Sequence, residues 1–227
     1  MTHETGTLQP EGVRSMFDRI APVYDVMNHV MTVGLDRRWR RLTAQAVVQP
    51  GARVLDACCG TGDLAIADER EGGLVTGLDF SAEMLVRARR KSDTIEWVQG
   101  DMLALPYADG SFDVATVGFG VRNVADLEAG LLELRRVLRP GGRLAILEIT
   151  QPTGPLKPFF SLWFDHIVPL LGRVLPGGNA YTYLPASVRR FPGAVTLADM
   201  INAAGFEGAT YQLFGGSIVA LHTATAR

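Results

Sequence analysis

The sequence predicts an α/β fold built on a mostly parallel, seven-stranded sheet that ends in an antiparallel hairpin. Short apolar runs alternate with stretches of helical periodicity, as in folds whose strands are joined by helices. The first apolar run leads into a glycine turn at residues 56–63, and the chain closes with two β-rich runs around 214–216. This combination is typical of Rossmann-like sheets, and 227 residues suffice for one such domain, so we expect a single domain over residues 1–227.

The composition excludes several classes of function. Charged residues make up 20% of the chain and the net charge is −2, which lacks the basic surplus of nucleic-acid-binding proteins. The two cysteines, Cys58 and Cys59, are adjacent, which disfavours a disulfide between them and fits a reducing cytoplasm. The four histidines show no ligand spacing, so we predict no metal site. We also expect no signal peptide, because no basic segment followed by an apolar core opens the chain.

The N-terminal part predicts helices that precede the sheet. Residues 1–10 are polar and are expected to form a disordered lead-in. Apolar residues then recur at helical spacing with an interruption at Pro22, which predicts two short helices. A third helix is expected over 36–48, and its four arginines are interpreted as a solvated face. We expect the segment of about 11–48 to cover the ligand site as a lid; simple packing on the sheet is the alternative.

Regular alternation begins after Pro50–Gly51. Strands are predicted at 53–57, 75–79, 95–98, 112–117 and 143–149, with helices at 62–70, 82–91 and 124–138. This order implies helices on both faces of the sheet and a ligand at the carboxyl ends of the strands. The closing hairpin is predicted from 209–213 and 217–223.

An irregular segment of about 150–195 is predicted as an insertion on the substrate side. Its apolar run, 159–171, is shorter than the ~20 residues needed to span a bilayer. A helix lining an apolar pocket, a helix in a membrane interface and a buried core helix all remain open.

The glycine turn predicts a nucleotide site. Gly60 and Gly62 would let a ligand approach bare backbone, and the following helix start offers unpaired N–H groups. Together with Ala65 they also satisfy the dinucleotide pattern G-x-G-x-x-G/A, which is weak support when it stands alone. Asp79 closes the second strand, where a carboxylate can accept both hydroxyls of a ribose. S-adenosylmethionine and NAD both carry that ribose; helix capping is the alternative role for Asp79.

Acidic residues around this turn favour S-adenosylmethionine. Asp56 precedes the turn and Asp63 follows it, and both would repel a pyrophosphate while suiting an ammonium and a sulfonium group. Asp101, after the third strand, would lie where an adenine amino group could reach it. We therefore favour a methyltransferase over an NAD-dependent reductase, and a non-catalytic scaffold is disfavoured because the turn is intact.

Several stretches resemble the UbiE-like ubiquinone/menaquinone C-methyltransferases. The most distinctive are Tyr24–Asp25–Val26–Met27–Asn28 and Gly118–Phe119–Gly120–Val121–Arg122–Asn123. The glycine turn and the Pro140–Gly141–Gly142 stretch are shared by many class I methyltransferases. The resemblance runs from about Met16 to the C-terminus, with departures from the usual serine, histidine and serine at Thr32, Asp36 and Gly118.

This resemblance implies a class I S-adenosylmethionine-dependent methyltransferase fold and carbon methylation of a polyprenylated hydroquinone. Demethylmenaquinol is the first choice of substrate; a ubiquinone precursor or a small phenolic or polyketide metabolite is the alternative. Similarity implies cofactor contacts at Thr61, Asp79, Asp101 and Met102, and the full predicted set adds Asp56, Gly60, Gly62, Phe80 and Gly118. A lipid-tailed substrate further implies a cytoplasmic enzyme in transient contact with the inner face of the membrane. We also considered a homodimer.

The chemistry requires a phenolate, because the ring carbon beside it is a good nucleophile. A phenol with a pKa of ~10 ionises at neutral pH at a cost of roughly 4 kcal/mol. We predict that Arg122, after the fourth strand, faces the methyl group and stabilises the phenolate or a water, with Asn123 orienting it. Tyr24 or Asp25 from the lid would complete the relay. The alternative pairs Arg122 with a surface carboxylate.

Overall fold

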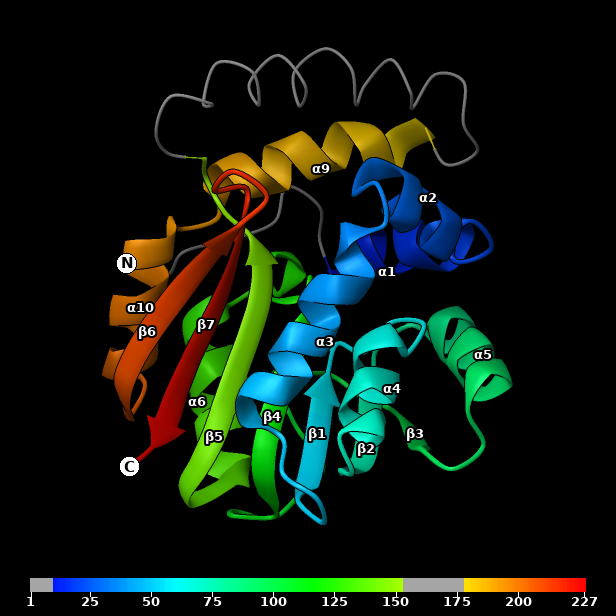
Figure 1. Cartoon of the computed structure of the whole chain (residues 1–227). Helices are drawn as coiled ribbons and strands as arrows, with labels where there is room; N and C mark the ends of the chain where they lie inside the picture. The colour runs from blue at the N-terminus through cyan, green and yellow to red at the C-terminus, as the bar shows by residue number, and fades with distance from the viewer. Residues whose placement is uncertain (1–9, 153–177) are drawn as a thin grey trace.

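A computed structural model describes residues 10–152 and 178–227 of the chain. Its seven-stranded sheet has the order β3-β2-β1-β4-β5-β7-β6 (Figure 1). The strands are β1 (Arg53–Ala57), β2 (Leu74–Asp79), β3 (Glu96–Gln99), β4 (Phe112–Gly118), β5 (Leu138–Ile149), β6 (Phe206–Phe214) and β7 (Val219–Ala226). The first five strands are parallel, and β7 is antiparallel to both β5 and β6. The predicted sheet and its closing hairpin are confirmed.

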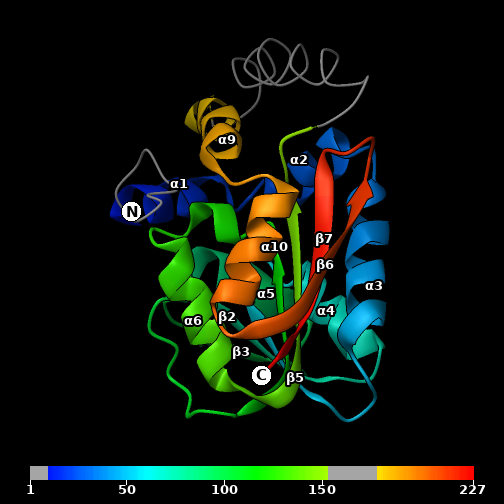
Figure 2. The ribbon, with the colours of Figure 1, turned by 90° about the vertical axis from the view of Figure 1, so that its left-hand side faces the viewer.

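Helices cover both faces of this sheet. Those described are α1 (Pro10–Ile20), α2 (Tyr24–Met31), α3 (Leu35–Val47), α4 (Asp63–Arg70), α5 (Ala82–Lys91), α6 (Leu127–Val137), α9 (Gly178–Arg190) and α10 (Ala194–Ala203). Helices α3 and α4 lie on one face, while α6 and α10 lie on the other (Figure 2). A covered sheet needs apolar side chains on both faces of its strands. Accordingly, Val54 packs in one core with Trp39 and Ala65, and Leu55 packs in the other with Leu131.

Side-chain caps set where two of the helices begin. The Ser81 hydroxyl accepts the Met84 N–H at 3.2 Å, so α5 begins as predicted. Asp126 accepts the Ala129 N–H at 3.0 Å, so α6 begins at Leu127 and not at residue 124. The residues before it form a short 3-10 helix, Val121–Asn123.

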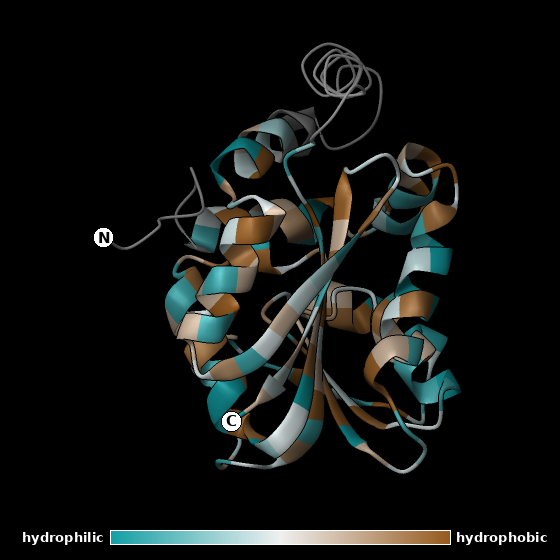
Figure 3. Cartoon of the chain, turned by 60° about the vertical axis from the view of Figure 1, so that its left-hand side comes forward, coloured by the Kyte–Doolittle hydropathy of each residue, from teal (hydrophilic) through white to brown (hydrophobic). Residues whose placement is uncertain are grey.

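The predicted helices on either side of Pro22 are α1 and α2, which we call the lid. Val13, Met16 and Ile20 of α1 pack against Met84 of α5 and Tyr183 of α9. Hydropathy colouring shows apolar ribbon facing the sheet and polar ribbon facing outward on the helices that cover it (Figure 3). No helix in residues 10–152 or 178–227 is long and apolar enough to cross a bilayer.

Two outcomes concern the predicted insertion. The apolar run at 159–171 lies outside the described residues. The later part of the segment contains α9 and the start of α10, neither of which was predicted from the sequence.

Candidate cofactor and active site

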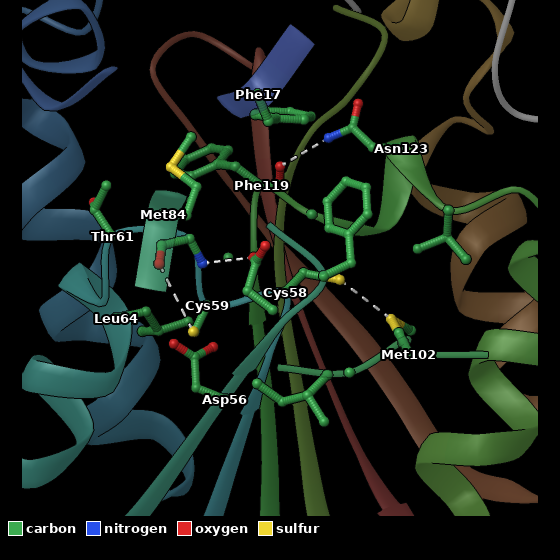
Figure 4. A pocket seen from close by; sticks show the side chains of 18 of the residues that line it. Phe17, Asp56, Cys58, Cys59, Thr61, Leu64, Met84, Met102, Phe119 and Asn123 are labelled. Carbon is green, nitrogen blue, oxygen red and sulfur yellow. Dashed lines mark hydrogen bonds between the residues drawn. The ribbon is translucent and has the colours of Figure 1, made fainter. Parts of the chain in front are cut away.

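A cavity opens at the carboxyl ends of the parallel strands, where β1 has β2 on one side and β4 on the other. Its space, open mouth included, is about 990 Å³. Asp56 lies at the strand end of the cavity, and Phe17 and Met84 lie at the opposite end (Figure 4). The cavity thus has a polar floor made by the sheet and an apolar cover made partly by the lid.

The glycine turn brings backbone to the cavity wall. Gly60 and Gly62 have φ angles of 56° and 86°, a region that favours glycine. A Cβ on Gly60 would meet nothing within 4 Å, and Gly60 lines the cavity. A Cβ on Gly62 would lie 2.4 Å from Trp97, and Gly62 does not line the cavity. Gly62 therefore allows α4 to begin beneath Trp97, and a cofactor contact at this glycine stays a prediction.

Asp79 braces the same turn. Its Oδ2 accepts the Gly60 N–H and its Oδ1 accepts the Ser81 N–H, both at 2.8 Å. Burial raises the pKa of Asp79 to about 6, although the hydrogen bonds from the Ser81 and Gly60 N–H groups act to lower this pKa. The side chain also lines the cavity, where its carboxylate can accept ribose hydroxyls. Supporting the turn and binding a ligand are thus compatible roles.

Three further carboxylates line the cavity: Asp56, Asp63 and Asp101. Asp56 is fully buried, and its pKa is raised by burial and by the nearby Asp68. Asp101 accepts the Leu103 N–H at 2.9 Å, which fixes its carboxylate at the end of β3. An acidic wall of this kind suits a ligand with ammonium and sulfonium groups and disfavours a pyrophosphate. The residues present therefore fit S-adenosylmethionine.

Apolar residues form the remaining wall. The Met102 sulfur lies 3.6 Å from the Cys58 thiol (Figure 4). Phe80 contacts Phe17 edge to face, with ring centroids 6.2 Å apart. Gly118 also lines the cavity, and a Cβ there would lie 3.0 Å from a methyl carbon of Leu64. Such a surface can hold a flat, apolar ring.

Asp25 ties the lid to the glycine turn. It accepts the Thr61 hydroxyl at 2.5 Å and lies 2.6 Å from the Lys91 ammonium. Lys91 also lies 2.6 Å from Asp63. Thr61 lines the cavity as predicted, whereas Asp25 does not; its neighbour Tyr24 does. The Asp25 carboxylate is therefore engaged by Thr61 and Lys91, and completion of the relay by Tyr24 or Asp25 stays a prediction.

Arg122 and Asn123 both donate to the Phe119 carbonyl, but only Asn123 lines the cavity. Asn123 lines the cavity, and its amide N–H group donates to the Phe119 carbonyl at 3.5 Å (Figure 4). Arg122 does not line the cavity; its Nη1 donates to Glu148 at 2.6 Å and to the Phe119 carbonyl at 2.7 Å. Arg122 thus lies outside the cavity wall, and its role toward the methyl group stays a prediction; its carboxylate partner, Glu148, is buried and not on the surface.

Among the residues of the cavity wall that the sequence interpretation missed, Arg40 is the charged one. Arg40 was taken as part of a solvated face, yet its side chain is buried and lines the cavity. Two signals pointed to this: Asp36 stands one helical turn earlier, and the adjacent Trp39 marks the buried face of α3.

The chain matches the sequence profile of the ubiE/COQ5 methyltransferase family over residues 5–226. Proteins named demethylmenaquinone methyltransferase are among its relatives. The one from Lactiplantibacillus plantarum is 42% identical over 94% of this chain and 95% of its own length. The one from Thermus thermophilus is 42% identical over 91% of this chain and 98% of its own length.

Solved structures show the same fold at low sequence identity. A Thermotoga maritima protein, described as an S-adenosylmethionine-dependent methyltransferase and possible histamine N-methyltransferase, superposes with a TM-score of 0.69 at 18% identity, covering 95% of this chain and all of that one. The [4+2]-cyclase SpnF superposes with a TM-score of 0.72 at 19% identity, covering 96% of each chain. Since one fold carries different reactions, function has to be argued from the site.

Proposed function

From the premise that this chain belongs to the ubiE/COQ5 methyltransferase family, we propose that it methylates a ring carbon of demethylmenaquinol to give menaquinol. S-adenosylmethionine is the methyl donor. The observation that carries the proposal is the cavity at the glycine turn, whose acidic floor suits the donor while its apolar walls suit a quinol ring. The names of the relatives from Lactiplantibacillus plantarum and Thermus thermophilus support the choice of substrate.

The acidic residues bind the donor in this proposal. When bound, S-adenosylmethionine supplies a methyl group on a positively charged sulfur. Asp79 accepts hydrogen bonds from the ribose hydroxyls, and Asp101 accepts one from the adenine amino group. Asp56 attracts the positively charged end of the cofactor. Phe80 and Met102 exclude water from the adenine.

The acceptor ring is activated by one residue that follows β4 and one residue of the lid. Asn123 and Tyr24 both line the cavity and can hold the hydroquinone oxygen or a water that takes its proton. The Oδ1 atom of Asn123 is buried and has no hydrogen-bond partner within the described ranges, so it is available to a ligand. Arg122 is a positioning residue that acts from outside the cavity wall, because its hydrogen bond to the Phe119 carbonyl fixes the loop that carries Asn123.

The lid offers a surface suited to the membrane that holds the substrate. Val26, Val30 and Val33 are 67%, 61% and 86% exposed. Exposed arginines on the adjoining α3, at positions 37, 38 and 41, add positive charge beside these valines. Apolar side chains flanked by cations are typical of segments that touch an anionic lipid surface. We therefore propose that the enzyme works in the cytoplasm and contacts the inner face of the membrane transiently.

A test of the proposed function compares three acceptors in detergent. Purified protein would receive methyl-labelled S-adenosylmethionine together with demethylmenaquinol, a demethylated ubiquinone precursor or a water-soluble naphthol. We expect fastest label transfer to a ring carbon of demethylmenaquinol. Faster labelling of the ubiquinone precursor would assign a ubiquinone-type head group to the substrate. Faster labelling of the naphthol would favour a small phenolic substrate.

A further inference from the structure

Most of the charged side chains that line the cavity are acidic. Asp56, Asp63, Asp79 and Asp101 contribute carboxylates, whereas Arg40 is the one lysine or arginine on the described part of the wall. The cofactor carries an ammonium, a sulfonium and a single carboxylate. The carboxylates of the cavity can pair with the ammonium and the sulfonium. The carboxylate of the cofactor needs a cationic partner.

Arg40 is held firmly at this position. Arg40 is only 6% exposed. Its Nη1 donates to Asp36 Oδ2 at 2.5 Å, and its guanidinium carbon lies 5.3 Å from the ring centroid of Phe119. Burial acts to raise the pKa of Asp36, but Arg40, with the Thr32 hydroxyl, holds it below its ordinary value. Asp36 is therefore ionised at neutral pH and keeps the guanidinium in place.

The ion pair with Asp36 leaves much of the guanidinium for a ligand. A guanidinium has five N–H donors, and the bond to Asp36 uses a donor on Nη1. Arg40 and Asp56 line the same cavity, and the positive charge of Arg40 acts to lower the pKa of Asp56, which burial raises. A cation and an acid that line one cavity complement an amino-acid group, with its carboxylate and its ammonium.

We infer that Arg40 binds the α-carboxylate of the methionine part of S-adenosylmethionine. Arginine suits this role because its planar fork can donate two parallel hydrogen bonds to a carboxylate. The inference rests on the donor of the proposed function and not on the identity of the acceptor. It assigns a ligand to a residue that the sequence alone placed on the solvated face of α3.

The test is calorimetric titration with S-adenosylmethionine and with its decarboxylated analogue, which lacks only the carboxylate. Wild-type protein should bind the complete cofactor about 10- to 100-fold more tightly, the range expected for hydrogen bonds between charged groups. Arg40→Met should weaken the complete cofactor by the same factor and change the analogue less than about twofold. Arg41→Met, an exposed arginine on the same helix, is the matched control and should change neither.

Three results would overturn the inference: equal binding of the two ligands by wild type, no effect of Arg40→Met, or equal losses for both ligands. If Arg40→Met fails to fold, the comparison of the two ligands with wild type and with Arg40→Lys tests the inference. Lysine keeps the positive charge but lacks the planar fork, so Arg40→Lys should weaken binding of the complete cofactor only. Loss of quinol methylation with this ligand preference intact would overturn the proposed acceptor alone. Absence of S-adenosylmethionine binding to wild type would overturn both.

Discussion

The guanidinium of Arg122 lies 2.6 Å from the carboxylate of Glu148, and both side chains are buried at the end of the sheet. Removing one member of such a pair leaves an unpaired buried charge, which costs about 3–5 kcal/mol. Arg122→Met should lower the free energy of unfolding by about that amount, measured by urea titration. The double variant Arg122→Met/Glu148→Leu should recover most of the loss, and a double variant as unstable as the single one would contradict this account.

The pair also changes how the catalytic role of Arg122 has to be tested. Turnover of an Arg122 variant must be compared per folded molecule, because loss of the pair destabilises the protein as well. We expect Arg122→Met/Glu148→Leu to bind S-adenosylmethionine normally while its kcat falls about tenfold or more, since the loop carrying Asn123 loses its anchor. An unchanged kcat in the folded double variant would remove Arg122 from the mechanism.

Lys91 should control how quickly the lid opens. It bridges Asp25 of the lid and Asp63 of α4, both at 2.6 Å, and these side chains are partly exposed. Partly exposed ion pairs contribute about 0.2–1 kcal/mol each. Lys91→Met should therefore raise the dissociation rate of S-adenosylhomocysteine about two- to fivefold in stopped-flow tryptophan fluorescence. Arg90→Met, on the same helix and exposed, is the control, and an equal effect of both variants would exclude the ion pairs as the cause.

Two glycines of the nucleotide turn should respond differently to alanine. Both have left-handed φ angles, so each substitution strains the backbone by about 1–2 kcal/mol. A Cβ at Gly62 would also meet Trp97 at 2.4 Å, whereas one at Gly60 would enter the cavity. Gly62→Ala should therefore give the larger drop in melting temperature, and Gly60→Ala the larger drop in cofactor affinity. The opposite order in both measurements would contradict the assigned roles.

Asp79 predicts a pH dependence of cofactor binding. Burial raises its pKa to about 6 from 3.8, and ribose hydroxyls bind the ionised form. Affinity for S-adenosylmethionine should rise by up to about tenfold from pH 5 to pH 7. Calorimetry across this range should show the dependence in wild type and a flatter profile in Asp79→Asn. A profile that keeps its full slope in the variant would assign the proton to another group.

The same shift has the opposite sign for stability. The folded protein binds more protons at Asp79 than the unfolded chain between pH 3.8 and about 6. The Asp79 contribution to the free energy of unfolding therefore decreases as pH rises through this window. Urea titrations of wild type and Asp79→Asn at pH 5 and pH 7 would isolate this contribution.

The features predicted correctly from the sequence are those encoded locally. Strands buried on both faces appear as apolar runs, and the left-handed turn at Gly60 requires glycine, so the sheet and the nucleotide site were both recognised. The start of α10 gave a weaker signal, because Gly193 at its N-cap position provides no side-chain hydrogen bond.

The features that were missed or misplaced depend on contacts between distant residues. Arg122 lies outside the cavity wall, where it pairs with Glu148 near the end of the next strand along the chain. Asp25 is engaged by Lys91, which comes from α5. Arg40 is buried because the strands pack against α3; the arginine run alone does not separate Arg40 from its exposed neighbours, and only Asp36 and Trp39 point to the buried face.

The most direct test of the central claim is parallel calorimetric titration of the wild-type protein with S-adenosylmethionine, S-adenosylhomocysteine and NADH. The acidic cavity beside the glycine turn should bind the first two ligands and show no heat of binding with NADH, because its acidic wall disfavours a pyrophosphate. Binding of NADH without binding of S-adenosylmethionine would contradict the account of this site.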